Sequence, residues 1–150
     1  MKVVGLNGSP NKKSNTNFLL TKSLEAVEEE GFETETIRVP DVLDDLEVPF
    51  CEHCSSPCNQ SCYKGTKLEK AYNKLAKTDG IIMSSPVYFG TVSGQLKAFW
   101  DMSRAVRTEH ELVNTVGAAI SVGASTYGGQ ETTNSAMQDM MLVQGMTIVG

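Results

Sequence analysis

Short apolar runs alternate with amphipathic stretches along the chain, and this alternation predicts strands that alternate with helices. Apolar runs bounded by Gly, Asn, Ser or Pro are typical of buried strands, whereas apolar side chains spaced three or four residues apart are typical of helices. The predicted strands are residues 3–6, 32–39, 81–83, 115–122 and 146–149. The predicted helices are residues 66–77, 95–105 and 130–143, and an earlier segment that ends at Gly31 and carries Leu20, Leu24 and Val27 on one face.

Two stretches of this pattern are less regular than the others. In the second predicted strand, Phe32, Thr34 and Thr36 alternate with glutamates, and we expect these three side chains to form its apolar face. Residues 41–65 have no clean period, and we expect an irregular segment there.

The order of the elements predicts an α/β fold. Strands that alternate with helices form a parallel sheet whose right-handed crossovers cover both faces. Five strands fit a doubly wound, flavodoxin-like sheet of order 2-1-3-4-5 at least as well as half of a dinucleotide-binding fold. We expect residues 1–150 to form a single domain. The sequence stops within its fifth strand, so we expect either a fragment or a sheet face that another subunit covers.

Composition narrows the class of protein. With 40% apolar and 21% charged residues the chain is globular, and its net charge of −5 argues against nucleic acid or an anionic membrane as the main partner. No apolar run approaches the ~20 residues that span a bilayer. Residues 1–6 are too short an apolar start for a signal peptide, so we expect a cytoplasmic protein.

Three loops follow the predicted strands at the edge where an open parallel sheet binds its ligands, at the point where strand order reverses. The loops are residues 7–17, 84–94 and 121–130, and all are rich in Gly, Ser, Thr, Asn and Pro. The first runs into a helix start, whose free N–H groups and dipole favour a phosphate, although it matches neither the Walker nor the GxGxxG pattern. The alternative is an ordinary helix cap on a surface turn.

The second loop places Tyr88 and Phe89 beside Pro86 and Gly90. Aromatic and apolar walls with nearby backbone amides suit a planar heterocycle, whereas the alternative is that both rings pack on the core. The third loop is glycine-rich, and its pattern alone does not separate a binding loop from a plain turn.

Longer motifs within these loops resemble a known family. Gly-Ser-Pro followed by Ser-Asn-Thr, then Ser-Pro-Val-Tyr-Phe-Gly, Ser-Gly-Gln-Leu-Lys-Ala-Phe and Gly-Gly-Gln-Glu are similar to the NADPH-dependent FMN reductase superfamily, over essentially the whole chain. The resemblance implies FMN as cofactor, with dimers or tetramers whose subunit contacts lie near the flavin. The implied phosphate loop holds Ser9, Asn11, Ser14, Asn15, Thr16 and Asn17. The implied contacts of the isoalloxazine ring are Pro86, Val87, Tyr88, Phe89, Gly90, Gly123, Tyr127 and Gly128.

All four cysteines, Cys51, Cys54, Cys58 and Cys62, lie in the irregular segment before the second predicted helix. A secreted disulfide scaffold would spread its cysteines, so this local group predicts a metal or redox site. Four thiolates suit a [4Fe–4S] cluster, and zinc or a thiol/disulfide pair is the alternative. The insertion resembles that of the iron–sulfur flavoproteins, although the gap between the second and third cysteines is one residue longer than usual there and the last gap is shorter.

These features together predict an FMN-dependent oxidoreductase. We expect it to pass electrons between NAD(P)H or ferredoxin, FMN and a [4Fe–4S] cluster, with no catalytic acid–base pair among its side chains. The alternatives are a cluster-free NAD(P)H:FMN or quinone reductase and a non-enzymatic flavodoxin-like electron carrier. We expect a homodimer or homotetramer without nucleic-acid or membrane partners.

Overall fold

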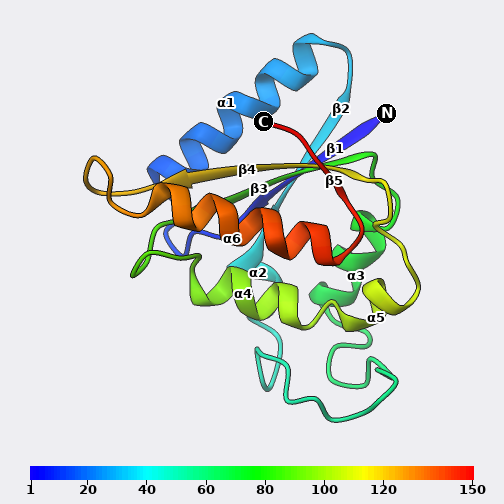
Figure 1. The fold of residues 1–150 in the computed structure, drawn as a ribbon. Coiled ribbons are helices and arrows are strands. Elements are labelled where there is room, and N and C mark those ends of the chain that lie inside the picture. The colour runs from blue at the N-terminus through cyan, green and yellow to red at the C-terminus, as the bar shows by residue number, and fades with distance from the viewer.

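The computed structural model describes residues 1–150, which form one parallel sheet of five strands in the order β2-β1-β3-β4-β5 (Figure 1). The strands are β1 (Lys2–Asn7), β2 (Glu33–Arg38), β3 (Gly80–Pro86), β4 (Val116–Val122) and β5 (Thr147–Ile148). β1 and β3 lie inside the sheet, and Val4, Leu6, Ile81 and Met83 on them are completely or almost completely buried. The predicted flavodoxin-like strand order is therefore confirmed.

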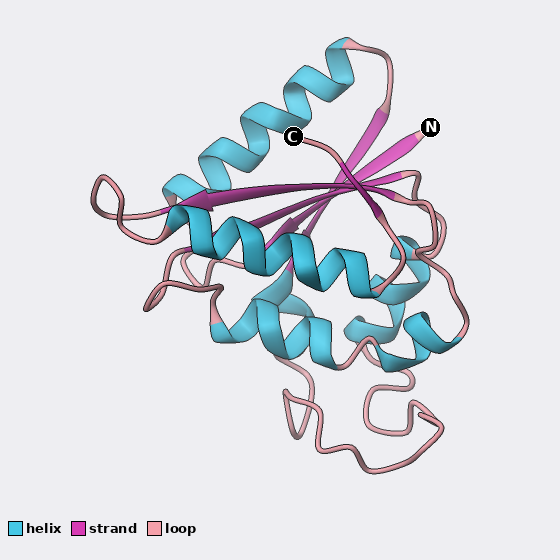
Figure 2. Ribbon diagram, viewed as in Figure 1, coloured by secondary structure: helices cyan, strands magenta, loops and turns pink.

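The helices cover the two faces of the sheet unequally. They are α1 (Asn15–Glu29), α2 (Val39–Leu43), α3 (Lys67–Leu75), α4 (Gly94–Asp101), α5 (Arg104–Thr108) and α6 (Gln130–Val143). Figure 2 shows α1 alone on one face and the other helices on the opposite face. The main core lies on that second face, where Leu96 and Phe99 of α4 and Met137 and Met141 of α6 are fully buried. None of the helices is long and apolar enough to cross a bilayer.

The predicted face of β2 was wrong. Thr36 is exposed and Ile37 is buried, although Glu33 is exposed and Phe32 and Thr34 are half-buried, so at the carboxyl end of β2 the buried face is the one that carries Ile37. Glu35 shares this face at its edge, where the ammonium groups of Lys2 and Lys74 pair with its carboxylate. The alternation of Thr and Glu did not identify the buried face, because these partners come from distant parts of the chain.

Two helices differ from the predictions. The short helix α2 begins where a continued strand was expected, with a proline in its first turn, a position where the missing N–H costs nothing. The single helix predicted over 95–105 is divided between α4 and α5. At the break, the buried Ser103 donates its hydroxyl hydrogen to the carbonyl of Trp100 (2.6 Å) and accepts from Nε2 of Gln144 (2.7 Å). A serine that bonds to local backbone in this way competes with the helical ladder.

The cysteine segment joins α2 to α3 without a regular helix or strand of its own. It projects as a long loop beyond the helices on the main-core side of the sheet (Figure 1). Its contacts with the fold include those from Arg104 of α5, which donates to the carbonyl of Ser55 (3.1 Å), and from the Lys67 amide, which donates to Asp45 (3.1 Å). Cys51 packs against the main core.

Candidate functional site

Three loops gather at the carboxyl ends of β1, β3 and β4, at one end of the sheet (Figure 1). Between them lies a cavity of about 500 Å³. Its walls are formed by Ser9, Asn11, Lys13, Ser14, Asn15, Thr16, Pro86, Val87, Tyr88, Val122, Gly123 and Ala124. The cavity thus lies at the switch point of the sheet, where ligands of this architecture bind.

Side chains of the first loop hold its own backbone. The Ser9 amide donates to Oδ1 of Asn7 (2.9 Å), the Asn11 amide to Oγ of Ser9 (3.2 Å), and the Lys13 amide to Oδ1 of Asn11 (2.9 Å). Each bond spans two residues, a pattern by which Asn and Ser fix turns. The loop is therefore shaped by its polar side chains, without a glycine-rich motif.

The start of α1 leaves donors free at the cavity. Oγ of Ser14 caps the helix by accepting from the Asn17 amide (3.1 Å). The amides of Asn15 and Thr16, the first two helical residues, have no acceptor within the chain. Free N–H groups at the positive end of a helix dipole favour an anion, and Lys13 adds a cation beside them.

Asn7, the last residue of β1, holds the first loop through hydrogen bonds of its side chain. It is fully buried, and its Nδ2 donates to Oδ1 of Asn17 (2.7 Å) while its Oδ1 holds the Ser9 amide. Asn17, predicted to bind phosphate, therefore directs its side chain to Asn7 and does not line the cavity. No motif in the first loop marked Asn7 as the residue that holds it, because the side-chain partner of Asn7 lies ten residues further on.

Buried serines join the first loop to the second. The Gly8 amide donates to the carbonyl of Ser84 (2.8 Å), and Oγ of Ser93 donates to the carbonyl of Gly8 (2.6 Å). Ser93 is also the N-cap of α4, since its Oγ accepts from the Leu96 amide (3.2 Å). A Cβ at Gly8 would lie 2.8 Å from Cβ of Leu96 and 2.9 Å from the Ser84 carbonyl oxygen, so only glycine allows this approach.

The second loop forms a tight hairpin. Tyr88 and Thr91 exchange backbone hydrogen bonds of 2.9 and 3.2 Å, and the residues between them, Phe89 (φ 50°) and Gly90 (φ 77°), both have positive φ. This is the backbone of a primed hairpin turn. Pro86, Val87 and Tyr88 line the cavity, whereas Phe89 at the tip is fully exposed and does not line it.

The third loop contributes its first residues to the cavity. Gly123 and Ala124 line it, while Tyr127 is 89% exposed and does not line it. Thr132 of α6 ties this region to the second loop, since its Oγ1 donates to the carbonyl of Gly90 (2.7 Å).

Most of the residues predicted to bind the flavin are brought together, but not all of them. Those at the cavity are Ser9, Asn11, Ser14, Asn15, Thr16, Pro86, Val87, Tyr88 and Gly123, and those outside it are Asn17, Phe89, Gly90, Tyr127 and Gly128. Sequence reasoning missed Lys13, Val122 and Ala124, although the positive charge of Lys13 beside the expected phosphate was a usable signal. Contact of these residues with a flavin stays a prediction.

The cavity has the chemistry that FMN requires. Its volume falls within the range of roughly 300–1,000 Å³ that small ligands occupy. The helix start supplies donors for a phosphate, and the Pro86, Val87 and Tyr88 wall offers an apolar surface to a planar ring. No carboxylate or imidazole lines the cavity, and its titratable side chains are Lys13 and Tyr88.

The four cysteines are all free thiols. Cys51 and Cys58 are half-buried, and Cys54 and Cys62 are exposed. Burial raises the pKa of the Cys62 thiol, and the nearby charges of Cys54 and Cys58 raise this pKa further. The donor chemistry suits a metal cluster, but nowhere do three or more Cys, His, Asp or Glu side chains form a group that could hold a metal ion. The thiols would have to move together to become ligands.

Comparison with known proteins places this geometry in a family. The model of the NADPH-dependent FMN reductase family matches residues 1–150. An iron–sulfur flavoprotein of Methanocaldococcus jannaschii is 43% identical over 152 residues, covering 100% of this chain and 76% of that protein. One of Methanosarcina thermophila is 40% identical over 152 residues, covering 100% and 78%. The solved apo structure of an NADH:FMN oxidoreductase has a TM-score of 0.76 at 21% identity, covering 99% of this chain and 72% of that one, and it supports the fold.

The family expected from the loop motifs is therefore confirmed by a family match over every residue of the chain and by relatives of more than one organism. The fold agrees, since the strand order is that of the flavodoxin-like proteins. The chain belongs to the NADPH-dependent FMN reductase family, in the group of the iron–sulfur flavoproteins, and is an FMN-dependent oxidoreductase.

Proposed function

We propose that this oxidoreductase passes electrons between NAD(P)H or a ferredoxin, FMN and a [4Fe–4S] cluster held by the four cysteines. The observation that carries the proposal is the cavity at the carboxyl ends of β1, β3 and β4, where unpaired helix-start amides face an apolar wall. The iron–sulfur names of the relatives and the four clustered thiols support the cluster.

In this proposal each part of the cavity has a separate task. The amides of Asn15 and Thr16, with the ammonium group of Lys13, bind the phosphate of FMN. Pro86, Val87 and Tyr88 form one side of the ring site, and the residues from Val122 to Ala124 form the other. Bound FMN supplies the exchange between two-electron and one-electron chemistry. The chain positions the flavin and limits the access of water to it.

The proposed ligands of the cluster are Cys51, Cys54, Cys58 and Cys62, because a [4Fe–4S] cluster requires four thiolates. Burial raises the pKa of Cys62 most, and the charges of neighbouring thiolates raise it further, so the thiols repel one another once ionised. A bound cationic iron core would offset that repulsion, because metal ligation favours the thiolate form.

The test is the ultraviolet–visible spectrum of anaerobically purified protein, with iron and acid-labile sulfide measured on the same sample. Flavin bands with a broad shoulder and about four irons per chain are expected, as four cysteine ligands imply. Protein that is colourless and takes up no added FMN would contradict the flavin site. Flavin bands without iron would remove the cluster and leave the flavin site standing.

A second candidate is a cluster-free NAD(P)H:FMN or quinone reductase, whose cysteines hold zinc or form a redox switch. The observation that favours its redox-switch form is that the thiols form no metal-binding group in their present arrangement. Steady oxidation of NAD(P)H with an added quinone by iron-free protein would support this candidate. A protein that binds FMN but oxidises neither NADH nor NADPH would instead be an electron carrier.

We propose that the active form is a homodimer or homotetramer. Exposed aromatic side chains on the second and third loops support this, since Tyr88 is 45% exposed, Tyr127 is 89% exposed and Phe89 is fully exposed. Exposed aromatic residues are typical of contact surfaces. Light scattering on the FMN-loaded protein gives the subunit number, and a monomer at micromolar concentration would contradict the proposal.

A further inference from the structure

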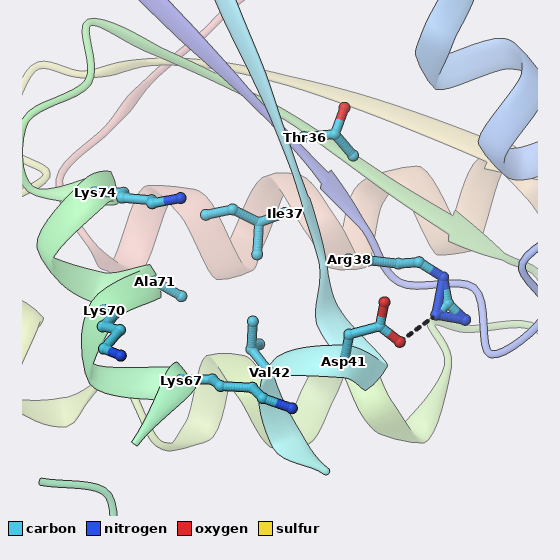
Figure 3. A pocket seen from close by; sticks show the side chains of 9 residues that line it. All are labelled: Thr36, Ile37, Arg38, Asp41, Val42, Lys67, Lys70, Ala71 and Lys74. Atoms are coloured by element: carbon cyan, nitrogen blue, oxygen red, sulfur yellow. Dashed lines mark hydrogen bonds and ion pairs between the residues drawn. The ribbon is translucent and has the colours of Figure 1, made fainter. Parts of the chain in front are cut away.

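A positively charged groove lies at the β2 edge of the sheet and shares no lining residue with the flavin cavity. It has a volume of about 400 Å³ and runs between β2, α2 and α3. Figure 3 shows the side chains of Lys67 and Lys74 extending from α3 toward β2 and α2, with Arg38 paired to Asp41 on the opposite wall. Lys70 completes the row along α3. Four cations and one carboxylate therefore line this groove.

The charge of the groove is unusual for this chain. Residues 64–77 hold five lysines and a single carboxylate, whereas the whole chain has a net charge of −5. Lys67 and Lys74 pair with Asp44 and Glu35, and the side chain of Lys70 has no acceptor. Nε of Arg38 is buried and also has no partner. Arg38, Lys67 and Lys74 thus each have a carboxylate partner, and Lys70 is the lining cation whose positive charge is free.

The groove lies between the two proposed redox sites. At one end, Nη2 of Arg38 donates to the carbonyl of Pro10 in the phosphate loop (3.0 Å). At the other end, α2 and α3 are the helices that precede and follow the cysteine segment. The Lys67 amide donates to Asp45, near the start of that segment (3.1 Å). A partner seated in the groove would therefore lie beside both the phosphate loop and the cysteine segment.

The exposure of the lysines distinguishes between two kinds of anionic occupant. The side chains of Lys67 and Lys74 are 51% and 49% exposed. A small ligand is typically buried over roughly 70–90% of its surface, which a half-exposed row of lysines does not provide. Flexible cations on a rigid helix suit a transient protein contact, in which charge steers the encounter and the buried area is small.

We propose that the groove lined by Arg38, Lys67, Lys70 and Lys74 is the docking surface for an acidic protein electron carrier. This inference rests on the proposed function, since it names the partner class that delivers or receives the electrons. Charge complementarity is its basis: the carboxylates of the carrier would meet the lysines of α3, while the acidic remainder of the chain repels the carrier elsewhere.

The test measures the dissociation constant between FMN-loaded protein and a strongly acidic two-cluster bacterial ferredoxin, labelled for fluorescence polarisation. The variants are Lys70→Glu and the double variant Lys64→Glu/Lys70→Glu, in which neither exposed lysine side chain bonds to any acceptor. The matched control is Lys22→Glu on α1, which has the same change of charge on the opposite face of the sheet (Figure 1).

We expect wild-type binding to weaken about tenfold between about 20 and 200 mM salt, because exposed charges are screened. Lys70→Glu should weaken binding about fivefold at low salt and the double variant more, whereas Lys22→Glu should stay within about twofold of wild type. The three variants should bind FMN as wild type does, since none of Lys22, Lys64 and Lys70 lines the flavin cavity.

Three results would overturn the docking surface: no binding of the ferredoxin, binding that salt does not weaken, or equal affinities of wild type and the double variant. If citrate displaces bound ferredoxin and binds more tightly than the ferredoxin does, the groove would instead be a site for a small polyanion. The flavin spectrum of the same sample, with its iron and acid-labile sulfide, tests the proposed function separately. Flavin bands with bound iron, but with no role for the lysines, would remove only the docking surface.

Discussion

Replacement of Asn7 by alanine tests how the phosphate loop is built. Asn7→Ala removes two hydrogen bonds of 2.7 and 2.9 Å from a fully buried position and leaves the Ser9 amide and Oδ1 of Asn17 without their partner. At about 1 kcal/mol for each neutral hydrogen bond, we expect the free energy of unfolding to fall by about 2 kcal/mol. Urea unfolding followed by circular dichroism measures this change.

The same substitution should separate binding of the phosphate from binding of the ring. If the full loss of about 2 kcal/mol comes from the stability of the ordered phosphate loop, the affinity for FMN should be about 30-fold weaker. Riboflavin, which lacks the phosphate, should bind Asn7→Ala nearly as well as it binds wild type. Fluorescence titration of both flavins gives the comparison, and Asn73→Ala on the exposed surface of α3 is the matched control.

A double-mutant cycle gives the sharpest refutation. Asn17→Ala removes one of the two bonds of Asn7, so the double variant should be little less stable than Asn7→Ala alone. Strictly additive losses would show that the two side chains do not interact. An Asn7→Ala protein within about 0.5 kcal/mol of wild type, or one that loses FMN and riboflavin equally, would refute the assigned role of Asn7.

Three further predictions follow from other contacts. Gly8→Ala places a Cβ 2.8 Å from Cβ of Leu96 and should cost about 1–3 kcal/mol of stability in urea unfolding; an unchanged midpoint would show that the loop can shift freely. Two lysine ammonium groups lower the pKa of Glu35, so its contribution is full above the unfolded value of 4.5 and is lost as pH falls through the lower folded pKa. Between about pH 7 and about pH 3, wild type should therefore lose up to about 1 kcal/mol more stability than Glu35→Gln, and equal losses would contradict the ion pairs. Cys54→Ser should abolish bound iron and sulfide while FMN stays bound, and unchanged iron would exclude Cys54 as a ligand.

The sheet and the position of its ligand cavity could be predicted because each rests on local pattern. Apolar runs such as 81–83 and 115–122 mark the inner strands, and topology alone then places the loops after β1, β3 and β4 at one end. Residues adjacent to the strand ends, such as Pro86 and Gly123, therefore lie at the cavity as expected. Phe89 lies outside it because a primed turn directs the tip of the hairpin into solvent.

What could not be predicted depends on partners distant in sequence. Gln144 approaches Ser103 from α6 and helps to divide a helix that the pattern makes continuous. Glu35 of β2 pairs with two lysines that are distant in sequence, one of them in β1 and the other in α3. The role of Asn7 also depends on its partners, because the pattern of apolar and polar residues does not mark a buried asparagine at a strand end.

The position of positive charge on this acidic chain implies that FMN phosphate and an acidic carrier are bound by different kinds of electrostatic interaction. FMN phosphate would meet the fixed N–H dipoles of Asn15 and Thr16 inside a cavity, where ionic screening is weak. The α3 groove offers half-exposed ammonium groups, which salt screens strongly. Raised salt should therefore release a docked carrier well before it releases the flavin, so carrier exchange can be fast while the cofactor stays bound. A flavin affinity that falls with salt as steeply as carrier binding would mean that long-range charge, and not the loop that Asn7 organises, dominates the phosphate site.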